Sequence, residues 1–360
     1  MLTRARKRLV AAVGAMAALG GLTMAVAPEA HAAGQTEYVY SASMHKNIPV
    51  RIVDGGGGGP KPTLYLLDGL RAPNNTSGWL QNNTGADRFM AGKGTNLVIP
   101  FGGGGSFYTD WERPDPKLGV NKWETFLTRE LPAYMKKNHN SDNRRNGIAG
   151  LSMSGTSALN LASRHPGFYK AVASYSGYPT VTFPGFTQGI QASVATMGGD
   201  PNNMWGFFPA GEWFQNDPFL SANNLAGHYV YLSSGTGLGS KFDSSINPSS
   251  ANFNPVKFSQ MVPLEVAASV STRLYIPRVA VVPGVKLTTH VTPDGDHWWD
   301  RPTQRIPRVE GPAASDAEEG DDQPTRQVPA VDEDSSDDTP RSALDEARAF
   351  RRRGTQDSGE

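Results

Sequence analysis

The feature that most constrains the fold of this chain is the alternation of short apolar runs with longer amphipathic stretches. The runs are apolar at every position, which is typical of strands buried on both faces of a parallel sheet. They lie at 63–67, 96–99, 147–149, 171–175 and 229–232. Stretches with apolar residues every three or four positions, as in helices, are 122–137, 154–163 and 255–270. The pattern predicts an α/β fold with a mostly parallel central sheet flanked by helices, and the more alternating segment 38–53 predicts an antiparallel edge hairpin.

Charge is distributed unevenly along the chain. Acidic and basic side chains are equal in number, at 34 each, but positions 1–32 have a balance of +3 and positions 310–360 a balance of −9, which leaves +6 between them. The acidic end has no apolar periodicity and cannot bury enough surface to offset the entropy of ordering. We therefore expect a folded domain at 33–304 and a disordered acidic tail at 305–360.

The first 32 residues have the pattern of a secretory signal. A basic segment precedes an apolar, Gly/Ala-rich stretch, and Ala30-His31-Ala32 is the small-x-small motif at which signal peptides are cleaved. An uncleaved membrane anchor is the alternative, but the apolar stretch is short and rich in glycine for that role. We expect a signal peptide at 1–32, export of the chain, and no transmembrane segment in the mature protein.

Composition excludes several classes of protein. The chain contains no cysteine, which rules out disulfides, thiolate zinc sites and a cysteine nucleophile. The basic run Arg351-Arg352-Arg353 is too short and isolated to indicate nucleic-acid binding. We expect no metal, cofactor or nucleic-acid partner.

The strongest local signal is the segment Gly150-Leu151-Ser152-Met153-Ser154-Gly155. It follows an apolar run and opens a helical pattern, which is the context of the nucleophile elbow of α/β-hydrolases. We predict that Ser152 is a nucleophile and that the amide of Met153, at the helix N-terminus, donates to an oxyanion. A serine-rich helix cap after a buried strand is the plainer alternative.

A serine nucleophile needs a histidine base and an acid, which follow it in the chain order Ser, acid, His. His297 follows a predicted strand and its loop, where the base belongs, whereas His290 lies inside the strand pattern. Two carboxylates compete for the role of the acid. Glu265 lies in an apolar helical stretch, where a carboxylate needs a partner, and Asp243 follows a predicted strand closely. The sequence leaves these two nearly even.

A second oxyanion donor usually comes from the loop after an early strand. The segment Leu67-Asp68-Gly69-Leu70-Arg71 is such a loop, so the amide of Leu70 is the candidate. A plain Asp-Gly turn would explain the same residues.

Together these residues resemble the secreted mycolyltransferases of mycolic-acid-bearing bacteria. The matching motifs occur in family order between about positions 40 and 300. The longest are Tyr65-Leu66-Leu67-Asp68-Gly69-Leu70-Arg71-Ala72, Ser106-Phe107-Tyr108-Thr109-Asp110-Trp111, Lys122-Trp123-Glu124-Thr125-Phe126-Leu127-Thr128 and Gly150-Leu151-Ser152-Met153.

The resemblance implies an α/β-hydrolase fold with a Ser–Glu–His triad, and so favours Glu265 over Asp243 as the acid. By position in the family motifs, the triad is Ser152, Glu265 and His297, and the oxyanion donors are Leu70 and Met153. The implied sugar contacts are Asp68, Arg71 and Trp299.

The implied reaction is transfer of mycolic acid from trehalose monomycolate, through a serine acyl-enzyme, to a second trehalose monomycolate or to cell-wall arabinan. It would take place at the cell envelope after secretion, and the family also suggests host matrix proteins as partners. A secreted carboxylesterase of the same fold and a non-catalytic envelope adhesion protein are the alternatives. The chain departs from the family in lacking a cysteine pair, in having Ser77 at an asparagine position, and in having Pro302 and a polar tail where a closing helix is expected.

Overall fold

The computed structural model describes residues 34–81, 84–238, 245, 247–295 and 297, which all belong to one compact unit of the chain, Met1–Ile306. The signal peptide expected at 1–32, the tail expected at 305–360 and the region around Pro302 lie outside these residues and stay predictions. The domain boundaries at 33 and 304 are likewise untested.

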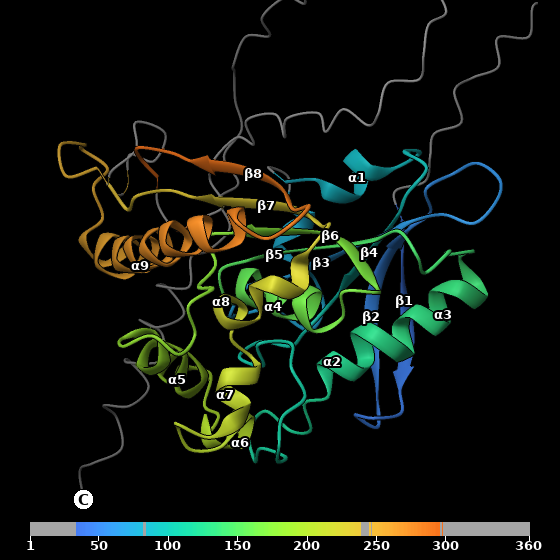
Figure 1. The fold of residues 1–360 in the computed structure, drawn as a ribbon, viewed down its shortest axis with the longest axis horizontal. Helices are drawn as coiled ribbons and strands as arrows, with labels where there is room; N and C mark the ends of the chain where they lie inside the picture. The colour runs from blue at the N-terminus through green and yellow to red at the C-terminus, as the bar shows by residue number, and fades with distance from the viewer. Residues whose placement is uncertain (1–33, 82–83, 239–244, 246, 296, 298–360) are drawn as a thin grey trace, which may run out of the picture. The chain divides into compact units, whose positions relative to one another are not determined.

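An eight-stranded sheet in the order β1-β2-β4-β3-β5-β6-β7-β8 forms the centre of the fold (Figure 1). The strands are β1 (Gln35–Ser41), β2 (Lys46–Val53), β3 (Thr63–Leu67), β4 (Asn96–Pro100), β5 (Asn146–Leu151), β6 (Tyr169–Tyr175), β7 (Tyr229–Ser234) and β8 (Lys286–Val291). The hairpin β1–β2 is antiparallel and β2 pairs antiparallel with β4, while all pairs from β4 to β8 are parallel. The predicted α/β class, the parallel sheet and the edge hairpin are confirmed.

Helices cover the sheet on both faces. They are α1 (Ala86–Met90), α2 (Trp123–Thr125), the π-helical turn η2 (Phe126–Glu130), α3 (Leu131–Asn138), α4 (Met153–Arg164), α5 (Phe186–Thr196), α6 (Asn202–Trp205), α7 (Gly211–Gln215), α8 (Pro218–Ser221) and α9 (Pro255–Ala280), with the 3₁₀ turns η1 (Gly78–Leu80) and η3 (Ala222–Leu225). In Figure 1, α4, α8 and α9 lie below the sheet and α1 lies above it. Within the part of the chain that the structure covers, no helix is both long and apolar enough to cross a membrane.

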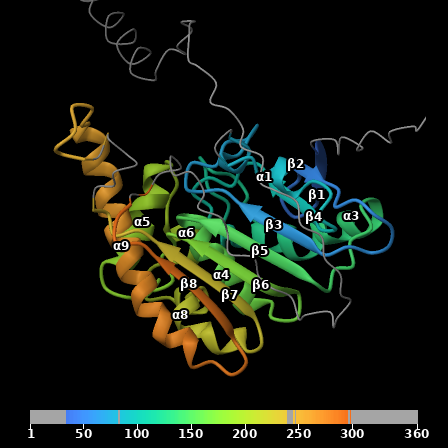
Figure 2. The ribbon, with the colours of Figure 1, turned by 90° about the horizontal axis from the view of Figure 1, so that it is seen from above.

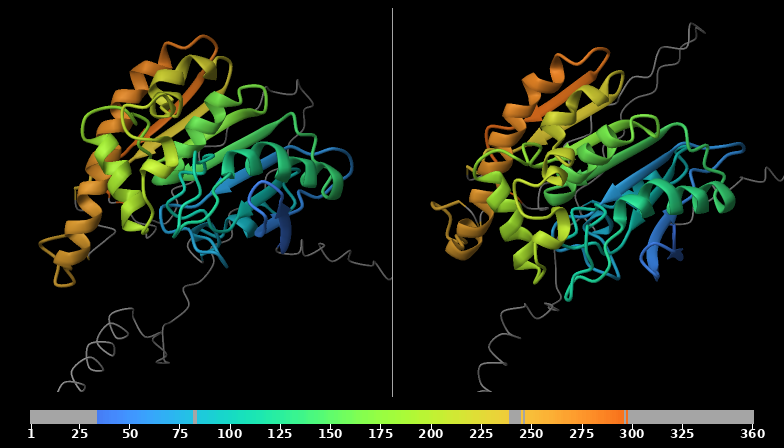
Figure 3. Two further views of the ribbon diagram at one scale, coloured as in Figure 1. Left: turned by 90° about the horizontal axis from the view of Figure 1, so that it is seen from below. Right: turned by 60° about the horizontal axis from the view of Figure 1, so that its bottom comes forward.

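The larger hydrophobic core lies between the sheet and helices α2–α4 and α9, and includes Trp123, Phe126 and Tyr275. A smaller core on the opposite face gathers Leu66, Ile99 and neighbours beneath α1 and η1. Figure 2 shows strands β3 to β8 side by side, with α9 running along β8. Residues 181–225, between β6 and β7, form an excursion from the sheet that includes α5–α8. Figure 3 shows this excursion next to α9.

The parallel strands bring their carboxyl ends to one edge of the sheet. Leu67 of β3 is in register with Gly150 of β5, and Leu151 with Tyr175 of β6. Ser234 of β7 is in register with Val291 of β8. The loops after β3, β5, β6, β7 and β8 therefore gather at this edge, which is where ligand sites of open α/β sheets form.

Candidate active site

Ser152 forms the sharp turn between β5 and α4. Its backbone has φ 55° and ψ −124°, a strained conformation for a residue with a side chain, and its amide donates to the carbonyl of Tyr175 at 2.8 Å. The turn brings α4 so close to β5 that a Cβ on Gly150 would lie 2.1 Å from the carbonyl oxygen of Ser154. This is the elbow geometry, and it requires glycine at position 150.

Ser154 stands where a second glycine is usual, and the structure shows what it does instead. Its buried hydroxyl donates to the carbonyl of Leu67 at 2.8 Å and accepts from the amide of Leu151 at 2.9 Å. The side chain thus ties the elbow to the end of β3.

The segments that carry the two expected oxyanion donors both lie beside the elbow. Met153 is the first residue of α4, so its amide has no acceptor inside the helix. The loop before Leu70 runs against Ser152, because a Cβ built on Gly69 would lie 4.0 Å from the Cβ of Ser152. The carbonyl of Leu70 accepts from the amide of Gly105 at 2.9 Å, which holds this loop in place.

Glu265 and His297 are brought together by α9 and the loop after β8. Glu265 Oε2 lies 2.7 Å from His297 Nδ1, and the Glu265 side chain is wholly buried. Its other oxygen, Oε1, accepts from the Ser176 hydroxyl at 2.8 Å and from the Gly235 amide. A buried carboxylate is tolerated only when hydrogen-bond donors surround it, as they do here. With Oε1 fixed by Ser176 and Gly235, Oε2 orients the imidazole ring of His297.

The loop after β8, which carries His297, is joined to the loop after β7. The amide of Thr292 donates to Ser234 O at 3.0 Å, and the amides of Gly237 and Gly295 donate to Gly295 O and Leu238 O at 2.9 and 3.0 Å. Asp243, the other candidate for the acid, lies outside the described residues. The assignment of Glu265 as the acid therefore depends on its own contact with His297.

Tyr178 is a residue that the sequence did not single out. Its hydroxyl lies 3.4 Å from His297 Nε2. Among the residues described, no hydrogen bond joins Ser152 directly to His297. The sequence signal that could have indicated Tyr178 is its position soon after a buried strand, in Ser174-Tyr175-Ser176-Gly177-Tyr178. Tyrosines are common at such positions, so the signal does not distinguish this one.

The three expected sugar contacts have different surroundings. Asp68 is buried, and its carboxylate accepts from the amides of Gly69 at 2.7 Å and Gly78 at 2.8 Å, so it organises the loop in which it lies. Arg71 is exposed at the same loop. Trp299 lies outside the described residues, and its role stays a prediction.

The aromatic residues of the excursion divide into two groups. Trp205 is buried, with its ring centroid 5.0 Å from that of Trp213. Phe207 and Phe208 are 71% and 40% exposed. The first group therefore packs the excursion, and the second offers apolar surface to solvent.

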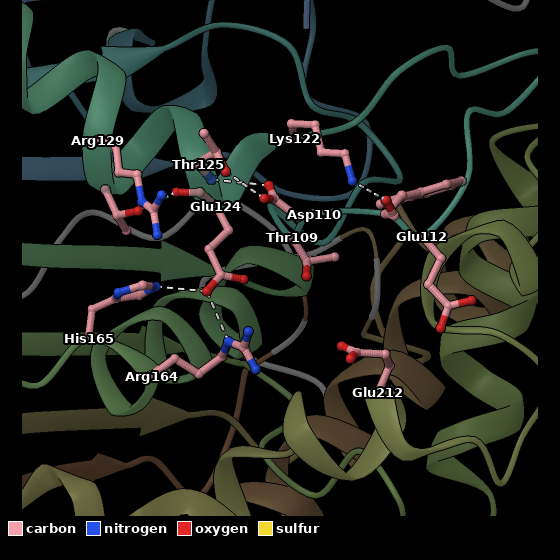
Figure 4. A pocket seen from close by; sticks show the side chains of 12 residues that line it. Thr109, Asp110, Glu112, Lys122, Glu124, Thr125, Arg129, Arg164, His165 and Glu212 are labelled. Atoms are coloured by element: carbon pink, nitrogen blue, oxygen red, sulfur yellow. Dashed lines mark hydrogen bonds and ion pairs between the residues drawn. The ribbon is translucent and has the colours of Figure 1, made fainter. Parts of the chain in front are cut away.

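A separate polar pocket of about 350 Å³ lies at the other end of α4 (Figure 4). Glu124 Oε1 accepts there from Arg164 Nε at 3.0 Å and from His165 Nε2 at 2.7 Å. The twelve residues of α4 place it about 18 Å from Ser152. His165 is thus bound to Glu124 and far from the elbow. Within the described chain, no cluster of His, Asp or Glu side chains is arranged to hold a metal ion.

A parallel sheet with an elbow serine and a buried glutamate–histidine pair at its carboxyl edge defines an esterase of the α/β-hydrolase class. Comparison with known proteins agrees, because the family model described as "Putative esterase" matches residues 41–253. A diacylglycerol acyltransferase/mycolyltransferase (Ag85C) of Mycobacterium avium is 37% identical over 250 residues, which cover 65% of this chain and 69% of that protein. Another (Ag85A), of Mycobacterium ulcerans, is 38% identical over 64% of this chain and 72% of its own length. The chain belongs to this esterase family, in the mycolyltransferase group that these relatives represent.

Solved structures share this fold. The crystal structure of MPT51 (FbpC1) from Mycobacterium tuberculosis is 29% identical and superposes with a TM-score of 0.62, covering 74% of this chain and 92% of that one. An S-formylglutathione hydrolase from Agrobacterium tumefaciens, 15% identical with a TM-score of 0.53 over 73% of this chain and 88% of its own, shares the fold.

Proposed function

We propose that this chain transfers the mycolyl group of trehalose monomycolate through an acyl-enzyme on Ser152. The observation that carries the proposal is the pair formed by buried Glu265 and His297, 2.7 Å apart, at the edge of the sheet where Ser152 forms the elbow. The printed names of the mycobacterial relatives, diacylglycerol acyltransferase/mycolyltransferase, support the choice of acyl transfer and of the mycolyl group.

In the first half-reaction, Ser152 Oγ attacks the ester carbonyl carbon and its proton moves to Nε2 of His297. Glu265 holds the imidazole with Nδ1–H toward its carboxylate and stabilises the imidazolium that forms. The amides of Met153 and Leu70 donate to the oxyanion of the tetrahedral intermediate. The intermediate collapses when the C–O bond to trehalose breaks, and His297 returns its proton to the leaving sugar oxygen.

In the second half-reaction, a hydroxyl of the acceptor attacks the acyl-enzyme and gives its proton to His297, which then protonates Ser152 as it leaves. Transfer in place of hydrolysis requires the sugar to exclude water from the acyl-enzyme. Exposed Arg71, loop-forming Asp68 and Trp299 are the proposed sugar contacts. Exposed Phe207 and Phe208 are suited to contact the lipid.

The place of action follows from the sequence. A cleaved signal peptide at 1–32 would export the chain, and the balance of +6 on its central part suits an anionic cell envelope. A second trehalose monomycolate and cell-wall arabinan are the proposed acceptors, and host matrix proteins are a further proposed partner.

The experiment uses the purified mature chain with radiolabelled trehalose monomycolate, with products separated by thin-layer chromatography. Labelled trehalose dimycolate is the expected product. Free mycolate alone would indicate a carboxylesterase, and no product of either kind would favour the adhesion protein. In Ser152→Ala, turnover should fall by more than about a thousand-fold. The matched control is Ser193→Ala, since Ser193 is a half-buried serine of α5 whose hydroxyl donates to Gly189 O.

A further inference from the structure

The backbone of Tyr178, in the loop after β6, is fixed against α4. Its amide donates to Thr156 Oγ1 of α4 at 2.9 Å. The preceding residue, Gly177, packs so tightly that a Cβ on it would lie 2.4 Å from Ser174 Oγ and 2.9 Å from the carbonyl carbon of Gly155. The backbone therefore leaves Tyr178 little freedom, and its ring lies 6.0 Å from the ring of His297, centroid to centroid.

The hydroxyl of Tyr178 faces two acceptors at nearly equal distances. One is Nε2 of His297 at 3.4 Å, and the other is the carbonyl oxygen of Leu264 at 3.3 Å. Both contacts are long for hydrogen bonds, as expected when one hydrogen is shared between two acceptors. Leu264 precedes Glu265 in α9, so the tyrosine contacts the element that holds the imidazole on its other side.

Nε2 is the nitrogen of His297 that matters for chemistry. Glu265 occupies Nδ1, so the proton of Ser152 must be accepted at Nε2. The Tyr178 hydroxyl lies 3.4 Å from this nitrogen. Burial and the nearby carboxylate of Glu265 raise the pKa of Tyr178 well above that of a free phenol. The hydroxyl therefore stays protonated.

We propose that Tyr178 is a positioning residue that holds His297 through Nε2 in the resting enzyme and shifts its hydrogen bond to Leu264 O, which frees the Nε2 lone pair for the serine proton. In the resting state Nε2 is unprotonated and accepts from the Tyr178 hydroxyl. Nε2 has a single lone pair, so the hydroxyl rotates and donates to Leu264 O before Nε2 accepts the proton of Ser152. The resulting Nε2–H is then free to donate to the leaving oxygen. No proton leaves the tyrosine. The inference rests on the roles proposed above for Ser152 and His297.

Tyr178→Phe removes the hydroxyl and keeps the ring. We expect kcat for a short p-nitrophenyl ester to fall about ten-fold, with KM within two-fold of the wild type, because an unheld imidazole is less often correctly oriented. Tyr229→Phe is the matched control and should change neither quantity, because Tyr229 is an exposed residue at the start of β7 whose hydroxyl accepts from Lys286 Nζ.

Three measurements keep the outcomes distinct. Labelling by a fluorophosphonate in the wild type but not in Ser152→Ala tests the nucleophile, and its failure would overturn the proposed function. If the wild type labels and Tyr178→Phe keeps the same kcat, or becomes faster, the positioning role is overturned. The ¹⁵N shift of His297 Nε2 should report an accepted hydrogen bond in the resting wild type and its loss in Tyr178→Phe, and identical shifts would also overturn it.

Discussion

Glu265 and His297 are 32 positions apart in the chain, yet Glu265 Oε2 and His297 Nδ1 are 2.7 Å apart. Glu265 lies in α9, on the side of the helix that faces the sheet, and His297 lies in the loop after β8. The contact depends on the parallel pairing of β7 with β8, which sets their loops side by side, as Ser234 opposite Val291 shows. The acid is therefore positioned by a helix and the base by the neighbouring strand.

Glu265→Gln should lower kcat by about 10⁴-fold with little change in KM. The glutamine amide can present N–H to Nδ1, which favours the wrong imidazole tautomer and removes the charge that stabilises imidazolium. Ester hydrolysis and mycolyl transfer measured on the same preparation check this. The control is Glu212→Gln, the same change in the polar pocket at the other end of α4, and it should leave both rates unaffected. Equal loss in the two variants would argue against a specific role for Glu265.

Arg71→Ala should separate sugar binding from chemistry. Arg71 is exposed and lies outside the Glu265–His297 contacts, so hydrolysis of a short p-nitrophenyl ester should be unchanged. The KM for trehalose monomycolate should rise about ten-fold, which corresponds to one lost charge-assisted hydrogen bond. A parallel fall in both activities would indicate that Arg71 supports the loop and does not bind sugar.

Asp68→Ala is expected to behave differently from Arg71→Ala. The Asp68 carboxylate accepts from Gly69 and Gly78, so its removal leaves two amides without acceptors and loosens the loop that carries Leu70. Both the short ester and trehalose monomycolate should be turned over at least about ten-fold more slowly, because an oxyanion donor is displaced. Steady-state kinetics with the two substrates distinguish this from a loss of sugar affinity alone.

Two glycines should respond oppositely to alanine. Gly150→Ala would place a Cβ 2.1 Å from Ser154 O and should prevent folding or destabilise the chain by more than about 3 kcal/mol. Gly189 lies in α5 with nothing within 4 Å of a built Cβ, so Gly189→Ala should stabilise by about 0.5–1 kcal/mol. Urea unfolding followed by circular dichroism measures both. A destabilised Gly189→Ala would contradict the open surroundings of that position.

Stability should depend on pH through Asp115. Burial alone would raise the pKa of this carboxyl, but hydrogen bonds lower it to about 2; the donors are Asp200, Leu118, Asn203 and Lys117. A lowered folded pKa contributes stability above the unfolded value of 3.8, and the contribution is lost as the pH falls through about 2. Asp115→Asn should therefore cost about 2 kcal/mol at pH 6 and much less near pH 2. Urea unfolding at several pH values tests this, and a constant difference between the two proteins would contradict it.

Much of the fold could be predicted from local patterns. All five fully apolar runs are strands, and the amphipathic stretch at 154–163 is α4. The stretch at 255–270 is α9, although this helix continues to Ala280 because Tyr275 and Val279 are also buried. These successes share a cause, since periodicity and turn chemistry act between residues close in the chain. The elbow at Ser152 could be predicted for the same reason, because it requires only small neighbouring residues and a helix that follows directly in the chain.

The arrangement of the site depends on contacts between distant segments, and these the sequence alone did not decide. Chain order left Glu265 and Asp243 nearly even, because order states which residue follows another and not how far apart their side chains lie. The resemblance to a family favoured Glu265, and the structure places it against His297. Tyr178 had no distinguishing pattern, since its hydroxyl reaches His297 only through the loop after β6 and the packing of α9. Local residues thus determined the strands, the helices and the elbow, whereas strand register and helix packing decided which side chains meet there.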